Sequence, residues 1–268
     1  MDIIEQFDRW NGRYTSWKQR QRSGADELAG YPFVENSRAP FTPARRALSM
    51  MQVALISSAG AYIDGTDPFE TSTPDGDLNF REIPSEIELK DLRFSARDYD
   101  PVFVQQDANV QVPLARLFEF ELNRIIGQVN SVFWSFSGFI PNASRLANEM
   151  LPRLLERVHR YDVHSVLLIP ASRLCHQSCG LAARAIEQSG IPTMMLAVER
   201  EASESVRPPR IAYYAGQFGS VAGQANWPEH QRRVLDEALR WLEPMGEPGI
   251  KKLVVDLESK VEAARGER

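Results

Sequence analysis

The chain has little of what marks a secreted, membrane-spanning or nucleic-acid-binding protein. Its 268 residues include only two cysteines, and no apolar run reaches the roughly 18–20 residues of a membrane span. Residues 1–10 carry acidic side chains where a signal peptide would be basic and then apolar. The net charge of −5 argues against a nucleic-acid partner. We therefore expect a cytoplasmic protein that binds neither membranes nor nucleic acid.

The scarcity of cysteine also limits the chemistry of the chain. Two cysteines in a chain of this length do not make a disulfide framework. They stand four residues apart, at Cys175 and Cys179, which fits redox or metal chemistry in a reducing compartment better than a structural crosslink. The remaining composition, with 43% hydrophobic and 25% charged residues, is ordinary for a globular protein with a substantial core.

Short apolar runs alternate with amphipathic segments along most of the chain. This alternation predicts an α/β fold of three layers, with parallel or mostly parallel strands and an N-terminal arm; two similar Rossmann-like halves are one arrangement that fits it. The expected buried strands are at 53–56, 132–136, 163–169 and 191–198. The expected helices are at 114–129, 142–158 and 180–188.

The same pattern divides the chain into four parts. These are a helical and irregular arm at 1–50, a first α/β half at 51–145, a second half with the cysteines at 146–243, and a helical tail at 244–268. Trp10, Tyr14 and Trp17 recur at helical spacing in the arm, which we expect to wrap the body or a partner subunit. An ordinary leading helix followed by an irregular link is the alternative.

Two glycine- and proline-rich segments lack regular periodicity. The stretch 64–84 is long enough to cover a site rather than merely connect two elements. In 216–223 the glycine spacing matches neither the dinucleotide fingerprint nor the P-loop, which favours a substrate-covering or inter-subunit loop. From Gly249 onward the sequence predicts a charged helix.

The cysteines follow a predicted buried strand and precede a predicted helix. Ligands bind at the carboxyl ends of parallel strands, where helix amino termini present unpaired N–H groups. Those groups and the neighbouring Arg173 would lower a thiol pKa. Cysteines four apart on a helix are too distant for a disulfide, so we place Cys175 on the loop and Cys179 in the first helical turn. The alternative is a continuous helix on which both are small buried hydrophobes.

Several sequence blocks in a fixed order resemble the selenoprotein B family of glycine, sarcosine and betaine reductases, especially its proline-reductase-like branch. The resemblance covers about residues 41–242. Its blocks are 53–62, 67–69, 107–117 with Ile126 and Gly127, and Cys179-Gly180 followed by Ile186-Glu187 and 190–192. Each block is weak alone, and their order is the specific feature.

The resemblance implies a reaction and its reactive groups. Members of the family cleave a carbon–nitrogen bond reductively, with a selenocysteine in the strand-to-helix loop that attacks and a cysteine that resolves the selenium–sulfur bond. This chain has Cys175 and Cys179 in the matching loop and no selenocysteine. Residues 95–98, which precede the pair Tyr99-Asp100, contain no histidine, whereas members of the family have histidines just before this pair. A pyruvoyl group belongs to a separate chain in several such systems, so no cofactor is expected here.

The resemblance thus predicts a thiol-dependent reductase of a small nitrogen-containing or carboxylate-bearing molecule. Cys175 would attack and Cys179 resolve, and an external dithiol or thioredoxin-like protein would reduce the disulfide. His176 is a candidate general acid, with the bystander role of an exposed loop histidine as its alternative. We expect a homo-oligomer.

Candidate substrate-binding residues follow strand ends and helix starts: Ser57, Ser58, Gly60, Asp107, Asn109, Arg116 and Arg173. The strand-end residues would offer backbone donors to an anion. The alternatives are local: Asp107 and Asn109 as caps, and Arg116 in a salt bridge with Glu119 rather than clamping a carboxylate.

Other functions remain open at this point. A zinc site would recruit both cysteines with His176 and a distant His164 or His230, but a second cysteine pair is absent. A cofactor-free racemase needs cysteines on opposite sides of its substrate, which this spacing does not favour. A lyase or isomerase using one cysteine, and a non-catalytic binding or assembly subunit, are the further alternatives.

Overall fold

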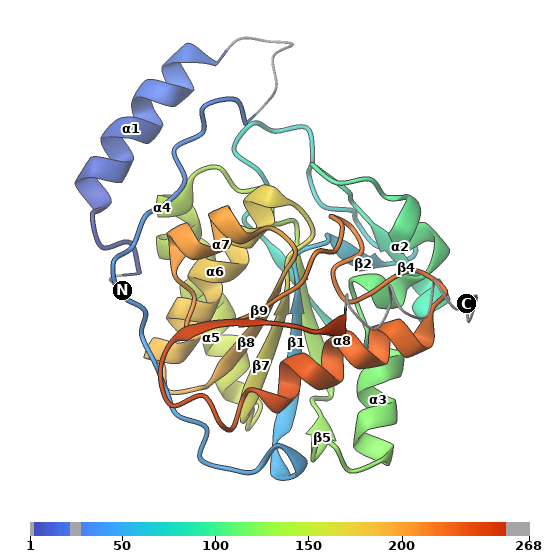
Figure 1. The fold of residues 1–268 in the computed structure, drawn as a ribbon. Coiled ribbons are helices and arrows are strands. Elements are labelled where there is room, and N and C mark those ends of the chain that lie inside the picture. Colours follow the sequence, from blue (N-terminus) through green and yellow to red (C-terminus); the bar gives the residue numbers. More distant parts are fainter. Residues whose placement is uncertain (1–2, 22–27, 256–268) are drawn as a thin grey trace.

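The computed structural model describes residues 3–21 and 28–255, which form an α/β fold around one eight-stranded sheet with helices on both faces (Figure 1). The strand order is β10-β9-β8-β7-β1-β6-β3, with β5 paired to β1. Every neighbouring pair in the sheet is parallel except β3 with β6. The predicted α/β architecture with a mostly parallel sheet and an N-terminal helix is confirmed.

The strands of this sheet are β1 (Gln52–Ser57), β3 (Phe80–Pro84), β5 (Gln128–Val129), β6 (Val132–Phe136), β7 (Ser165–Ile169), β8 (Thr193–Ala197), β9 (Arg210–Tyr213) and β10 (Gly249–Lys252). A separate antiparallel ribbon pairs β2 (Ala61–Ile63) with β4 (Leu92–Phe94). The helices are α1 (Phe7–Arg20), α2 (Val102–Gln106), α3 (Leu114–Leu122), α4 (Ala143–Arg145), α5 (Leu151–Arg160), α6 (Arg173–Gln188), α7 (Arg200–Val206) and α8 (Pro228–Arg240).

The sheet separates two apolar cores because successive strand residues point to opposite faces. In β1, Val53 and Leu55 join the core under α3 and α8, whereas Ala54 and Ile56 join the core under α5 and α6. Both faces of the central strands are covered, so their sequences read as continuous apolar runs rather than alternating ones. The central strands were predictable for this reason.

The direction in which successive strands are added to the sheet changes at β1. The chain passes from β1 to β6 on one side, then crosses to β7 on the other side and continues outward to β10. In open α/β sheets such a reversal leaves a crevice at the carboxyl ends of the strands, where ligands bind. A ligand site is therefore expected at the carboxyl ends of β6, β1 and β7.

Three predicted helices differ from the observed elements. The helix expected at 180–188 begins seven residues earlier, at Arg173, so that both cysteines lie within it. The helix expected at 114–129 ends at Leu122, because Arg124 adopts a left-handed conformation with φ 56° and Val129 belongs to β5. The helix expected at 142–158 contains a π-helical turn, η4 (Leu146–Met150), immediately before Pro152. Proline lacks an N–H and crowds the preceding turn, which accounts for the widened turn.

The prediction of a helix from Gly249 is wrong for the first residues of the tail. Gly249 to Lys252 form β10, which pairs in parallel with β9 at the edge of the sheet. The rest of that prediction, from residue 256, lies outside the described residues. The four-part division of the chain remains a prediction, although strands from both of its middle parts lie in one sheet.

The N-terminal arm lies against the body of the molecule. Helix α1 is amphipathic, and its buried residues Trp10, Tyr14 and Trp17 stack in series along one side. Residues that follow it run over α6 and α7, and Figure 1 shows α1 outside the helical layer that covers the sheet. Among the described residues, no helix combines the length and apolarity that crossing a membrane requires.

Candidate functional site

The candidate site is built where the ends of β1, β6 and β7 meet the start of α6. Cys175 lies in the first turn of α6, with its Sγ 3.7 Å from the carbonyl oxygen of Ser58, which follows β1. Gly138 follows β6, and a Cβ atom at that position would stand 2.5 Å from the same sulfur. The close contact requires glycine. The thiol therefore sits at the reversal point of the sheet.

Polar groups lie near the Cys175 sulfur. The hydroxyls of Ser172 and Ser58 and the backbone N–H groups of Ala171 and Ser172 each act to lower the pKa of the thiol. Ser172 caps the helix, because its hydroxyl accepts from the N–H of Cys175 at 3.4 Å. The Ser58 hydroxyl is itself fixed by the N–H of Ala171 at 3.0 Å. The arrangement resembles an anion-binding helix start.

Burial nevertheless dominates the protonation of Cys175. The side chain is 1% exposed, and this burial raises the pKa of the thiol despite these polar groups. The expectation of an exposed loop cysteine with a lowered pKa is therefore wrong, because Cys175 lies inside the helix and away from water. A thiolate at this position needs solvent or a ligand to enter.

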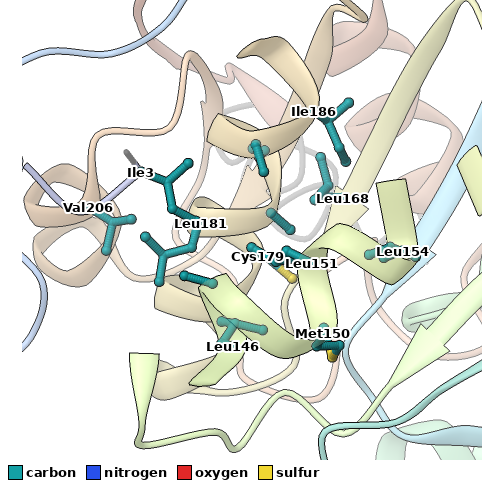
Figure 2. Close-up of a cluster of buried hydrophobic side chains, with 14 of the residues drawn as sticks. Ile3, Leu146, Met150, Leu151, Leu154, Leu168, Cys179, Leu181, Ile186 and Val206 are labelled. Carbon is teal, nitrogen blue, oxygen red and sulfur yellow. The ribbon is translucent and has the colours of Figure 1, made fainter. Parts of the chain in front are cut away.

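Cys179 lies one helical turn further and has a different environment. It is fully buried, and Figure 2 shows it among apolar side chains of α5, η4 and β7 such as Leu151 and Leu168. Burial raises the pKa of its thiol, and the Ser58 hydroxyl, which also serves Cys175, opposes that shift. Both thiols are free. A disulfide between them would require the first turn of α6 to unwind.

His176 is buried within α6 rather than exposed on a loop. One ring nitrogen, Nδ1, lies 2.6 Å from the carbonyl oxygen of Ser172, and the other, Nε2, accepts from the N–H of Val198 at 3.2 Å. Burial lowers the pKa of the imidazole to about 4. His176 is neutral at pH 7 and both ring nitrogens have backbone partners, which corrects the expectation of an exposed side chain.

Arg173 is the first residue of α6, but its guanidinium contacts groups other than the cysteines. Its guanidinium lies 3.5 Å from the carboxylate of Glu201 on α7 and 5.1 Å from the ring centre of Phe33 in the arm. The groups that affect the pKa of Cys175 are the serines and backbone N–H groups described above. The expectation that Arg173 lowers that pKa is therefore not supported by its position.

Two aromatic side chains pack against the small cluster that contains Cys175. Ala59, Ala171 and Cys175 form a small buried cluster, against which the partly buried Phe94 and Tyr99 pack. The Tyr99 hydroxyl donates to the carbonyl oxygen of Ala59 at 2.6 Å. These partners were absent from the predicted site; the only sequence signal for Tyr99 was its place in a family block.

The glycine-rich stretch 216–223 reaches the same cluster. The N–H of Gly219 donates to the carbonyl oxygen of Ala171 at 2.8 Å. Gly219 has φ 75°, and a Cβ there would stand 2.9 Å from the Tyr99 ring. The sequence predicted a substrate-covering or inter-subunit loop, and the structure places this loop beside the residues that flank Cys175.

The remaining residues at the end of β1 serve the local backbone. Ser57 is buried, and its hydroxyl accepts from the N–H of Ala59 at 3.4 Å. Gly60 has φ 70°, and a Cβ there would stand 2.7 Å from the carbonyl oxygen of Ser95. Gly60 thus allows the ribbon that carries Phe94 to approach the sheet.

The polar residues before α3 form a junction between loops. The Asp107 carboxylate accepts hydrogen bonds from Asn109, the N–H of Asn226 and the side chain of Gln231, which together lower its pKa. Asn109 in turn accepts from the N–H of Ala115. These bonds fix the start of α3 against α8. Their predicted role in substrate binding remains a prediction.

Arg116 forms the predicted salt bridge with Glu119, at 2.8 Å on α3. Of the two histidines considered as zinc ligands, His164 Nδ1 accepts from the N–H of Gln52, and His230 Nδ1 accepts from that of Gln224. Across residues 3–21 and 28–255, no group of three or more histidine, cysteine, aspartate or glutamate side chains could hold a metal ion.

A protein-family model described as glycine/sarcosine/betaine reductase selenoprotein B matches residues 23–171. D-proline reductase subunit gamma of Acetoanaerobium sticklandii is 28% identical over 202 residues, which cover 75% of this chain and 82% of that protein. The family match contains Ser58, Tyr99 and Gly138 and ends at Ala171, just before α6.

Two further relatives are longer proteins. Sarcosine reductase complex component B subunit beta of Peptoclostridium acidaminophilum is 28% identical over 214 residues, covering 76% of this chain and 48% of that protein. Glycine reductase complex component B subunit gamma of Symbiobacterium thermophilum is 24% identical over 215 residues, covering 76% and 48%. The chain thus spans about half the length of these two relatives. No solved structure matches the chain.

Proposed function

Because this chain belongs to the glycine/sarcosine/betaine reductase selenoprotein B family, we propose that it is a thiol-dependent reductase whose attacking group is Cys175. Its relatives are named as subunits of D-proline, glycine and sarcosine reductases, which supports a reductase-type role. The family match ends before α6, so the assignment of the thiols rests on the geometry around them.

One observation carries the proposal. The Cys175 sulfur lies at the reversal point of the sheet and at a helix start, where the neighbouring serine hydroxyls and backbone N–H groups oppose the effect of burial on the pKa of the thiol. Such donors stabilise a thiolate, which is the nucleophilic form of cysteine. Cys179, one turn away, shares the Ser58 hydroxyl with Cys175 but lacks the backbone N–H groups of the helix start. Cys175 is therefore the attacking thiol and Cys179 the resolving one.

The proposed reaction uses two electrons from the two thiols. The Cys175 thiolate attacks the carbon of a carbon–nitrogen bond; an S–C bond forms, the C–N bond breaks, and the leaving nitrogen takes a proton. The Cys179 thiolate then attacks the Cys175 sulfur, so that the S–C electron pair goes to carbon, which takes a proton. The substrate is reduced and the cysteines become a disulfide. An external dithiol or thioredoxin-like protein reduces it.

The resolving step requires the first turn of α6 to open. Helical Cβ atoms four residues apart are separated by about 5–6 Å, whereas a disulfide joins Cβ atoms about 3.5–4.5 Å apart. Ser172, which caps the helix through the N–H of Cys175, would release that N–H during the step. This turn of α6 is then the part of the site that moves during each cycle.

The substrate we propose is small and contains nitrogen or a carboxylate. The N–H of Ser172, the cap residue of α6, would bind a carboxylate oxygen once the site opens. No cofactor enters the proposal. Because the relatives are named as complex subunits, it includes assembly with a partner subunit, or with a second copy of this chain, as a requirement for turnover.

The decisive experiment is a single turnover followed by intact-protein mass. Reduced protein, assembled with a partner subunit or with a second copy of this chain, is mixed with D-proline, glycine, sarcosine or betaine, without and with dithiothreitol. We expect substrate reduction with loss of two hydrogens from the protein, reversed by dithiothreitol. Cys175→Ser should abolish turnover. Cys179→Ser should stop at a protein–substrate adduct on Cys175. Full activity in both variants would contradict the dithiol mechanism.

A binding or assembly subunit without catalysis is the second candidate, favoured by the burial of both thiols. If both cysteines react with iodoacetamide only after denaturation, in the isolated chain and with any partner present, they are core residues. Cys175→Ser would then leave complex formation and complex activity unchanged. Loss of complex activity in a folded Cys175→Ser variant would exclude this candidate.

A further inference from the structure

Three residues lie at the small cluster that contains Cys175, namely Phe94, Tyr99 and Gly219, which we call the Cys175 cover. Cys175 packs with the fully buried Ala59 and Ala171, whereas Phe94 and Tyr99 are partly exposed members of the same contact group. The two aromatic side chains therefore reach from the cluster that contains the thiol to the surface of the molecule.

Tyr99 connects the two sides of this small cluster. Its hydroxyl donates to the carbonyl oxygen of Ala59, after β1, at 2.6 Å. Its ring packs against Gly219, whose N–H donates to the carbonyl oxygen of Ala171, after β7, at 2.8 Å. Tyr99 is thus held by one hydrogen bond at its tip and by the glycine backbone along its ring.

The two aromatic residues differ in how firmly the chain holds them. Phe94 is the last residue of β4 and pairs with Ala61 in the ribbon. Tyr99 lies in the irregular segment between β4 and α2, directly after Asp98, which adopts a left-handed φ of 63°. Tyr99 therefore lies outside the regular secondary structure, whereas Phe94 is part of the paired ribbon.

We propose that Tyr99 controls access to Cys175: while its hydroxyl holds the carbonyl oxygen of Ala59, the thiol is sealed, and a substrate or alkylating reagent reaches it only after that bond opens. This inference deepens the proposed function, since it concerns the same thiol. While the Tyr99 hydrogen bond is in place, the site protects Cys175 from unwanted oxidation or alkylation. Once that bond opens, the donors of Ser58, Ala171 and Ser172 remain in place while water enters.

The test is iodoacetamide labelling of the two cysteines in the full chain without substrate, at one fixed pH, quantified for each peptide by mass spectrometry. Tyr99→Phe removes only the hydroxyl, and we expect it to increase the labelling rate of Cys175 about fivefold, as one lost hydrogen bond implies. Tyr99→Ala removes the ring as well and should increase the rate about a hundredfold, roughly what losing a buried aromatic contact implies. Gly219→Ala, which pushes on the ring, should also increase it.

Cys179 serves as the internal control, because it lies in the apolar core rather than under the cover. Its labelling should not change in any of these variants. The matched variant is Tyr161→Phe, which removes a hydroxyl that donates to Glu82 at 2.6 Å on another part of the sheet. It should leave the Cys175 rate unchanged.

Two outcomes would overturn the inference: an unchanged Cys175 rate in folded Tyr99→Phe and Tyr99→Ala, or a parallel rise at Cys179, which would indicate general loosening. The thermal midpoint identifies a variant that fails to fold, and Tyr99→Phe provides the test if Tyr99→Ala does. The labelling requires no turnover, so its result is independent of whether the chain reduces any of the substrates tried.

Discussion

The two faces of helix α6 bury very different side chains. One face, the cysteine face, carries Cys175 and Cys179 and continues with Ala182 and Ile186 at helical spacing. The opposite side carries three large polar groups, which we call the polar stripe: Gln177, Arg184 and Glu187. Both faces are shielded from water. The two faces differ in the groups that contact them.

The polar stripe binds the backbone of the N-terminal arm. Gln177 accepts from the N–H of Val34 and donates to the hydroxyl of Tyr31, each at 2.7 Å. Arg184 donates to the carbonyl oxygen of Ile3 at 3.0 Å. These partners are far away in sequence, and each satisfies a group that would be costly to bury alone. The arm is therefore part of the folded core.

At the end of the stripe, Glu187 and Arg210 form a fully buried ion pair with an N–O distance of 2.5 Å. Glu187 also accepts from the N–H of Thr42, and Arg210 lies over the Phe41 ring at 4.1 Å. Burial raises the pKa of Glu187 to about 7, against the attraction of Arg210. The polar stripe thus stabilises the fold through hydrogen bonds and an ion pair. On the cysteine face, by contrast, burial raises the pKa of the Cys175 thiol more than the neighbouring polar groups lower it.

Arg210→Met should cause the largest loss in the free energy of unfolding, because it removes the ion pair at the end of the polar stripe. Removing one partner of a buried ion pair leaves the other charge uncompensated, at a cost of about 3–5 kcal/mol in the free energy of unfolding. Urea denaturation measures it. The matched control is Arg200→Met, since Arg200 pairs with Glu204 on the surface of α7 and should cost less than about 1 kcal/mol. Equal losses in both variants would contradict this account.

The next effect concerns His176, which lies on α6 toward β8. Its folded pKa of about 4 is below the ordinary value of 6.5, so the unfolded chain takes up the proton first as the pH falls. The stabilisation is complete above about pH 7 and decreases by about 3 kcal/mol as the pH falls to 4.

The measurement is the free energy of unfolding from pH 7 to pH 4 for the wild type and His176→Gln. The difference between the two proteins should shift by about 3 kcal/mol in favour of the variant as the pH falls. A constant difference across this range would show that His176 is not buried in its neutral form.

On the cysteine face, the two thiols should respond differently to serine. Cys179→Ser places a hydroxyl among apolar side chains and should cost about 1–3 kcal/mol of unfolding free energy. Cys175→Ser should cost less, because Ser58 and Ser172 already supply hydrogen-bonding groups there. Thermal or urea denaturation compares them, with Cys179→Ala separating lost volume from added polarity. The reverse order would contradict the assigned environments.

The smallest effect is expected at Arg173, which is largely exposed at the start of α6. Arg173→Ala should change the free energy of unfolding by less than about 0.5 kcal/mol and leave the labelling rate of Cys175 unchanged. A slower rate would mean that the guanidinium activates the thiol, and would restore the expectation drawn from the sequence.

The sequence predicted the regular, fully buried elements and missed the irregular ones. Strands β1, β6, β7 and β8 were recognisable as apolar runs because helices cover both of their faces. The three-residue strands β2 and β4 have no periodicity long enough to detect. They nevertheless carry Phe94 to the thiol and hold Gly60 against Ser95.

The candidate site was only partly predictable for the same reason. Cys175 and Ser58 were found because the ends of buried strands are visible in sequence, whereas the start of α6 was predicted seven residues too late. Gly138 was not assigned to it, and Gly219 was expected only within a substrate-covering or inter-subunit loop, since the role of both glycines is to let a distant sulfur or ring approach closely. The polar stripe was missed as well, because Gln177, Arg184 and Glu187 read as an ordinary solvated helix face until the arm covers them.

The sequence by itself determined the strand–helix–strand unit, the family resemblance and the four-residue spacing of the two thiols after a buried strand. These follow from local periodicity and residue spacing, which act within a few turns of chain. Only the tertiary structure decided that β1 and β6 bring Ser58 and Gly138 to Cys175, and that both thiols are buried. Strand order joins residues more than a hundred positions apart, and exclusion of water, rather than the neighbours in sequence, sets the protonation of a thiol.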